Sequence, residues 1–245
     1  RQDLPGTENT YSSRRLVAQS LSGIGEPHML NMNFDEVAVV AAGTQPWVNS
    51  PAAGIARIKL EREAEESGHV TSFVRFDAGA SFPLHDHPQG EEIYVMQGTF
   101  SDENGDYPAG SYLRNPPGSR HTSFSRDGCT IFVKLNQFSD GDRATVELRP
   151  DQQQWRPGIG GLKVLPLHEY QGEHTALVYW PANEVFQPHR HWGGEEIVVL
   201  EGTFCDEHGK YPAGSWLRSP HLSQHTPYVE DEATLILVKV GHLLQ

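Results

Sequence analysis

Apolar positions along this chain gather in short runs that turn-forming residues separate. The runs Ile93-Tyr94-Val95-Met96 and Ile197-Val198-Val199-Leu200 are rich in side chains that favour strands, and Thr130 to Lys134 is similar. Asn104-Gly105 and His208-Gly209 are predicted hairpin turns, and Asn-Gly is the stronger signal of the two. With 24 Gly and 17 Pro and no helical period across these runs, the pattern predicts an all-β fold.

The sequence repeats itself at an offset of 104 residues. Between Ala78 and Asp127, 27 of 50 positions are identical to those of the later copy, with no gap. For example, Tyr107-Pro108-Ala109-Gly110-Ser111 recurs as Tyr211-Pro212-Ala213-Gly214-Ser215. A repeat of about 100 residues is too long for a solenoid unit and indicates a duplicated domain. Even strand spacing predicts a double-sheet β-barrel in each copy.

The duplication predicts three segments in the chain of 245 residues. They are an N-terminal extension or arm at 1–32, a first barrel at 33–143 and a second barrel at 144–245. Residues 1–28 are read as a tag, an upstream extension or a flexible arm, and 11–22 suits a short helix.

Histidines and a glutamate lie at metal-ligand spacing in the first copy. His85 and His87 are two residues apart, so on a strand their side chains point to the same side. The turn Pro88-Gln89-Gly90 returns Glu91 beside them, and His121 arrives from a distant strand. Three imidazole nitrogens and one carboxylate suit divalent Fe, Mn, Ni, Cu or Zn. A six-coordinate ion would keep two positions for water, dioxygen or substrate.

The second copy supplies the same set at the same spacing, with His189, His191, Glu195 and His225. One His-x-His pair alone is more often a surface or core pair than a metal site. The same four ligand residues occur in both copies at the same spacing, which chance explains poorly. We therefore predict one divalent transition metal ion in each half.

Residues 79–121 match a known two-part motif. Gly-(x)5-His-x-His-(x)3-Glu-(x)6-Gly, followed by Gly-(x)5-Pro-x-Gly-(x)2-His, resembles the signature of the cupin superfamily. The fuller pattern, with Gly-Glu-Glu-Ile and Tyr-Pro-Ala-Gly-Ser, resembles the ChrR-type cupin. That domain is the metal-binding C-terminal part of zinc-dependent anti-sigma factors and also occurs in stand-alone cupins. The resemblance covers about residues 33–245 and implies a bicupin of two jelly-roll barrels, whose ligands are the eight residues above.

Two departures from the motif lie in the second copy. Asn183 replaces the glycine that matches Gly79, and Leu222 replaces the one that matches Gly118. Asn tolerates a positive φ and Leu does not, so we expect the loop before His225 to take a different path. The second pocket should then have a different mouth, and the first site is the better catalytic candidate.

The sigma-binding role of the anti-sigma relatives does not carry over. Their N-terminal helical module holds a His/Cys zinc site, whereas Cys129 and Cys205 here are 76 residues apart. No Cys-x-x-Cys exists, and residues 1–33 are too few for that module. One disulfide between Cys129 and Cys205 is an alternative, but two unmatched cysteines are read more simply as free thiols in a reducing cytoplasm.

Glu91 and Glu195 have a second interpretation besides pure metal ligation, as general bases when not fully engaged with the metal. Glu92 and Glu196 follow on the opposite strand face and are expected to be solvated or to support the ligands. The repeated Arg114 and Arg218 suit either a bidentate clamp on an anionic substrate or a structural salt bridge. Three aromatic residues are either pocket-lining or ordinary core residues: Phe82, Phe186 and Trp192.

Composition excludes several functions. The balance of 19 basic and 32 acidic residues gives a net charge of −13 without a basic cluster, so we expect no nucleic-acid partner. No stretch approaches the roughly 18 apolar residues of a membrane span, and no signal peptide opens the chain. We therefore expect a cytoplasmic protein without a membrane partner.

Three functions follow, the first two from the resemblance and the third from the ligand set, and all have a small-molecule substrate or ligand. The first is a mononuclear non-haem metal dioxygenase, with Fe(II) favoured, acting on an enol or diketone-like substrate. The second is a metal-dependent small-ligand sensing or regulatory module without catalysis. The third is an isomerase or lyase with Ni or Zn as Lewis acid. The sequence does not identify the substrate or the metal. A homodimer is expected only because dimers are common in the superfamily.

Overall fold

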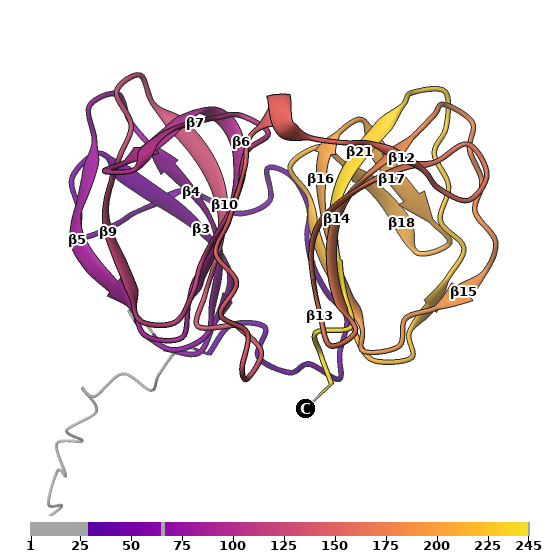
Figure 1. Cartoon of the computed structure of the whole chain (residues 1–245). Helices are drawn as coiled ribbons and strands as arrows, with labels where there is room; N and C mark the ends of the chain where they lie inside the picture. The colour runs from indigo at the N-terminus through magenta and orange to yellow at the C-terminus, as the bar shows by residue number, and fades with distance from the viewer. Residues whose placement is uncertain (1–28, 65–66, 245) are drawn as a thin grey trace, which may run out of the picture.

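The chain folds into two β-barrels. The computed structural model describes residues 29–64 and 67–244, and Figure 1 shows the barrels side by side. The predicted all-β fold of two tandem barrels is confirmed. The expected helix at 11–22 and most of the expected arm at 1–32 lie outside the described residues. Among those described, the 3-10 turn η1 (Pro150–Gln152) is the only helix, and no helix is long and apolar enough to cross a membrane.

In the first barrel, a large sheet runs in the order β11, β8, β6, β10, β4, β3, β2. The long strand β6 pairs with β8 and β10 through its first half and with β7 through its second, so it serves both walls. The strands are β2 (Val48–Asn49), β3 (Ile55–Arg62), β4 (Val70–Phe76), β5 (Ser81–His87), β6 (Glu91–Asp102), β7 (Gly105–Pro108), β8 (Tyr112–Asn115), β9 (Ser119–Phe124), β10 (Cys129–Leu135) and β11 (Val146–Leu148).

The second barrel repeats this plan, with the sheet order β1, β19, β16, β21, β14, β13, β12. Two short antiparallel pairs, β15 with β20 and the hairpin of β17 with β18, build its other wall. The strands are β1 (Ala38–Val40), β12 (Arg156–Pro157), β13 (Lys163–Tyr170), β14 (Glu173–Trp180), β15 (His189–Arg190), β16 (Glu195–Glu201), β17 (Thr203–Asp206), β18 (Gly209–Pro212), β19 (Trp216–Ser219), β20 (Gln224–His225) and β21 (Thr234–Val240).

The two halves exchange edge strands. β1, from the start of the first copy, pairs antiparallel with β19 of the second barrel. β11, which precedes the second barrel in sequence, pairs with β8 of the first barrel in the matching position. Each exchange covers an edge whose backbone groups would otherwise lack partners. Two strands therefore cross the predicted division at residue 143, and the domain boundaries stay a prediction.

Three apolar clusters hold the molecule together. One fills each barrel, around Val95 in the first and around Val199 in the second, both fully buried. The third lies between the large sheets and takes residues from both copies, among them Leu60, Phe132 and Trp216. Each large sheet therefore buries both of its faces, and the two large sheets pack face to face.

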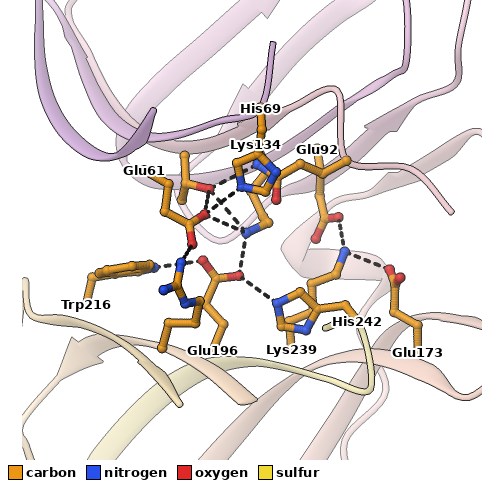
Figure 2. A network of polar contacts seen from close by, with 12 residues as sticks. Glu61, His69, Glu92, Lys134, Glu173, Glu196, Trp216, Lys239 and His242 are labelled. Atoms are coloured by element: carbon orange, nitrogen blue, oxygen red, sulfur yellow. Dashed lines mark hydrogen bonds and ion pairs between the residues drawn. The ribbon is translucent and has the colours of Figure 1, made fainter. Parts of the chain in front are cut away.

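Buried ion pairs accompany the shared apolar cluster (Figure 2). Lys134 of the first barrel lies 2.5 Å from Glu196 of the second, and Lys239 of the second lies 2.8 Å from Glu92 of the first. Both glutamates were expected to be solvated or to support the metal ligands, and this is wrong. They are 6% and 3% exposed because the opposite barrel covers the face of β6 and β16 on which they lie.

The two repeated arginines belong to the same interface. Arg114 donates to Glu92 and Asp142, and Arg218 pairs with Glu61 across the barrels. Both side chains are at most 1% exposed, so neither is placed to clamp a substrate. Of the two interpretations of these residues, the structural salt bridge is confirmed.

The predicted hairpins are present, one residue earlier than expected. Asp102 pairs with Gly105 and Asp206 with Gly209, so the two-residue loops are 103–104 and 207–208. Cys129 and Cys205 are both buried and unpaired, which confirms the free thiols.

Candidate metal centres

Strand pairing brings the four predicted ligands of the first barrel together. His85 and His87 lie on β5, and His85 is directly opposite His121 on β9. Gly90, with φ of +85°, ends the turn that starts β6 with Glu91. An added Cβ on Gly90 would lie 2.4 Å from the ring of Phe138, so the turn requires glycine. In the second barrel, His189 on β15 lies opposite His225 on β20 in the same way.

The side chains converge on one point in each barrel. In both clusters, the ligand atoms all lie within 4.8 Å of one another. Oε2 of Glu91 lies 3.3 Å from Nε2 of His87 and 3.4 Å from Nε2 of His121. The matching distances from Glu195 to His191 and His225 are 3.4 and 3.5 Å. All eight predicted metal-site residues are thus brought together as two sets of four.

The donor atoms fit a metal ion. Among the described residues, the buried Nε2 atoms of His87, His121, His191 and His225 have no hydrogen-bond partner. Buried polar atoms normally have partners, so four orphaned nitrogens that face a carboxylate need another explanation. Three neutral imidazoles and one carboxylate are the donor set of mononuclear transition-metal sites. The residues present therefore fit one divalent ion in each barrel.

A supporting layer of acceptors orients the histidine rings. Nδ1 of His121 lies 3.4 Å from Oδ2 of Asp102, and Nδ1 of His225 lies 3.3 Å from Oδ2 of Asp206. Nδ1 of His85 lies 2.9 Å from the carbonyl oxygen of Pro83. Such partners fix the tautomer that presents Nε2 to a metal. Sequence reasoning missed both aspartates, although their repetition at the same offset in Asp-Glu-x-Gly was a usable signal.

One further polar contact belongs to the first centre. Nδ2 of Asn115 donates to Oε2 of Glu91 at 3.0 Å, whereas the second copy has Ser219 at the matching position. The Asn115 contact holds the Glu91 carboxylate in place in the first centre.

Burial controls the ionisation of the second centre. The pKa of His191 is lowered to about 3, mainly by burial and then by the nearby His225 and His189. Burial also raises the pKa of Glu195 to about 7, although His225 opposes this. A neutral imidazole is the form that binds a metal. His191 is therefore ready to act as a ligand at neutral pH without first losing a proton.

A cavity of about 560 Å³ opens onto the first centre. His85 and Glu91 form part of its lining, and most of the remaining wall is apolar, including Phe82, Phe100 and Ile131. This size is typical of small-molecule sites. Phe82 is thus a pocket residue, the first of its two interpretations.

The second barrel fills the matching space differently. At the positions of Phe76 and Ser123, which line the first cavity, it has the larger Trp180 and Pro227. Trp180 is buried and packs against Phe186, so Phe186 is a core residue.

Trp192 of the second barrel, in contrast, is not a core residue, and it does not line the cavity of the first barrel. It is 70% exposed, and its ring lies 4.7 Å from that of His221.

The loop before His225 keeps its path, against expectation. Leu222 adopts a φ of +61° where Gly118 has +85°, and its N–H bonds the His191 carbonyl as that of Gly118 bonds His87. A Cβ at Gly118 would meet nothing within 4 Å, so the position has room for a side chain. The flanking hydrogen bonds hold Leu222 in a conformation that costs about 1–2 kcal/mol.

Comparison with known proteins agrees with this geometry. The model of the ChrR cupin-like domain family matches the chain twice, over residues 35–139 and 143–244. No curated protein sequence matches it.

Solved structures share the fold at low sequence identity. A presumed dioxygenase from Nostoc punctiforme has a TM-score of 0.69 at 16% identity, covering 86% of this chain and 84% of that chain. A presumed glyoxylate-induced protein from Pseudomonas aeruginosa has 0.66 at 14%, covering 90% and 95%. An oxalate decarboxylase mutant from Bacillus subtilis has 0.60 at 15%, covering 83% and 76%. Because the family model matches both halves, the chain belongs to the ChrR cupin-like family and carries two tandem copies of its domain.

Proposed function

We propose that the chain is a mononuclear non-haem metal dioxygenase that acts on a small enol or diketone-like molecule in its first barrel. The cavity at the first centre supports this most directly. It is the space in which a substrate would lie against His85 and Glu91, with apolar walls around its body. A bound Fe(II) would act there as Lewis acid and electron conduit between substrate and dioxygen.

Residues of the first barrel would bind and orient the substrate. His85, His87, Glu91 and His121 would hold the metal, and Asn115 fixes the carboxylate of Glu91. Phe82 and Phe100 exclude water from the substrate's body. A base role for Glu91 or Glu195 remains a prediction, because both carboxylates lie among the imidazole nitrogens as ligands would.

The choice of metal draws on the donor set and the fold neighbours. Iron is preferred for dioxygenase chemistry, and one structural neighbour is named a presumed dioxygenase. The Bacillus subtilis oxalate decarboxylase has Mn(II) centres, so manganese is the main competitor. Zinc, nickel and copper also suit these ligands.

The second centre is proposed to bind metal without turning over the same substrate. Trp180 and Pro227 replace smaller residues of the first cavity, which leaves less room beside His189. The partner of the protein is therefore a small molecule in the first barrel. A homodimer and a cytoplasmic location stay predictions.

Oxygen uptake by metal-loaded protein tests the proposal. Protein purified without a chelator or a nickel column is analysed for metals, reloaded anaerobically with Fe(II), and mixed with pentane-2,4-dione and related enols in an oxygen electrode. We expect dioxygen consumption that His121→Ala abolishes and the matched His225→Ala leaves largely intact. Tightly bound zinc and no uptake with any enol would instead favour the non-catalytic sensing module.

A further inference from the structure

In the first centre, each of the four ligands has a second polar partner behind it. Nδ1 of His87 lies 3.0 Å from Oγ of Ser119, and Nδ2 of Asn115 donates to Oε2 of Glu91 at 3.0 Å. The partners of the other two ligands are the Pro83 carbonyl oxygen for His85 and the Asp102 carboxylate for His121. Each ligand is therefore held in its orientation before a metal ion binds.

In the second centre, only two of the four ligands have such a partner. They are His189, 3.1 Å from the Gln187 carbonyl oxygen, and His225, 3.3 Å from Oδ2 of Asp206. Ser223 takes the place of Ser119, but within the described chain its buried Oγ has no hydrogen-bond partner, so the bond to His191 is not formed. Ser219 takes the place of Asn115, and among the described residues no hydrogen bond joins its side chain to Glu195.

The lack of support for Glu195 follows from a single difference in sequence. Asn115 and Ser219 each lie directly opposite the glutamate of their centre, on β8 and β19. Side chains in such positions begin about 5 Å apart, a gap that the amide of asparagine spans and the shorter serine hydroxyl does not. A carboxylate only accepts hydrogen bonds, so the amide presents its NH₂ group. The oxygen of Glu91 that receives this bond is the one that lies 3.3 and 3.4 Å from two imidazole nitrogens, so Asn115 holds the ligating atom itself.

We propose that the two centres differ in metal affinity, that the first is the tighter, and that Asn115 contributes most of the difference as a positioning residue acting through Glu91. A ligand whose orientation is already fixed loses less conformational freedom when an ion binds. Partners of metal ligands typically contribute about 10- to 100-fold in affinity. At limiting metal, the barrel with the cavity would then be loaded first. The inference goes beyond the proposed function, because it holds for any divalent ion that these ligands accept.

Zinc titration of the whole chain with one centre disabled tests the difference in affinity. His225→Ala leaves the first centre intact and His121→Ala leaves the second, and a chromophoric chelator competes for Zn(II) in each. We expect the first centre to bind Zn(II) at least tenfold more tightly than the second. Equal affinities, or a tighter second centre, would overturn the proposal. Zinc supports no turnover with dioxygen, so this result is independent of the oxygen-uptake test.

Exchanging the two residues assigns the difference to Asn115. In these backgrounds, Asn115→Ser should weaken the first centre about tenfold, because Glu91 loses its partner. Ser219→Asn should tighten the second centre several-fold, a gain that damage to the fold cannot produce. The control is Asn49→Ser on the exposed edge strand β2, which should change neither affinity. A second centre that Ser219→Asn leaves unchanged would contradict the assignment.

Cobalt separates the positioning of a ligand from a purely structural role. The visible absorption of bound Co(II) depends on how strongly each ligand donates, and Glu91 should donate differently once Asn115 no longer bonds its oxygen. We expect Asn115→Ser to shift these bands at full Co(II) loading of the first centre, whereas Asn49→Ser should leave them in place. Unchanged bands together with a weakened affinity would show that Asn115 supports the fold and not the ligand.

Discussion

At the scale of single residues, the metal centres depend on side chains that never touch the metal. Asp102 accepts from Nδ1 of His121, and two backbone N–H groups of the following turn, at Asn104 and Gly105, donate to its other oxygen. Burial would raise the pKa of Asp102, but the His121 contact and these N–H groups outweigh it, and its pKa is lowered. The carboxylate therefore stays charged and holds the imidazole with Nε2 toward the metal.

Replacing this aspartate should weaken metal binding at the first centre alone. In protein whose second site is disabled by His225→Ala, we expect Asp102→Asn to lower the affinity for Zn(II) by about 10- to 100-fold, because the ring loses its charged partner. Competition with a chromophoric chelator measures this. Asp106→Asn, on the exposed face of the next strand, is the control and should change nothing. Unaltered affinity in Asp102→Asn would show that His121 needs no orienting carboxylate.

At the scale of elements, tight loops between strands aim the ligands. The loops before His121 and His225 have the same hydrogen bonds, although one has Gly118 and the other Leu222 at the left-handed position. A side chain with positive φ is strained, and here the adjoining strand pairs maintain it. Leu222 is also 47% exposed, so its side chain gains little from burial.

Relieving this strain should stabilise the protein. We expect Leu222→Gly to raise the free energy of unfolding by up to about 1 kcal/mol, because the 1–2 kcal/mol of strain exceeds the extra chain entropy that glycine loses. Urea denaturation of metal-free protein measures the change. The reverse substitution, Gly118→Leu, should destabilise by a similar amount. A less stable Leu222→Gly variant would mean that Leu222 makes packing contacts that outweigh its strain.

Repetition explains what could be predicted from the sequence. Ligands such as His85 and Glu91 recur at one spacing, so both centres and the barrel fold followed from the pattern. The environment of Glu92 could not be predicted in this way. The alternation of side chains along a strand places Glu92 on the face opposite the metal ligands, but it does not show that the other barrel covers that face. The path of Leu222 was also mispredicted, since hydrogen bonds from distant strands overrode its backbone preference. The exchange of β1 and β11 leaves no local signal.

At the scale of the whole molecule, the barrels are joined by matched charges around a shared apolar core. Lys134 and Lys239 occupy equivalent positions on β10 and β21, and each reaches the glutamate of the opposite barrel (Figure 2). The arrangement has the reciprocity of a two-fold symmetric dimer interface, here within one chain. Separating the barrels would leave buried charges without partners, which costs several kcal/mol. We therefore infer that neither barrel is stable without the other.

The interface should make the stability of the molecule sensitive to acid. Burial alone would raise the pKa of Glu92, but Lys239 and Arg114 outweigh it and lower the pKa from 4.5 to about 2. A carboxylate whose pKa is lower in the folded than in the unfolded protein stabilises the fold when the pH is above its unfolded-state pKa. This stabilisation is lost as the pH falls toward the folded-state pKa. The loss should amount to about 3 kcal/mol between about pH 5 and 2.

Glu92→Gln should flatten this dependence, because glutamine does not titrate. Urea denaturation of metal-free protein at pH 7, 5, 4 and 3 measures the free energy of unfolding. The variant should be less stable at pH 7, since Lys239 and Arg114 lose their charged partner, yet lose less stability than the unaltered protein as the pH falls. Glu230→Gln, which breaks an exposed pair with Lys210, is the control and should follow the unaltered curve. Parallel curves for Glu92→Gln and the unaltered protein would show that this interface carboxylate does not set the acid response.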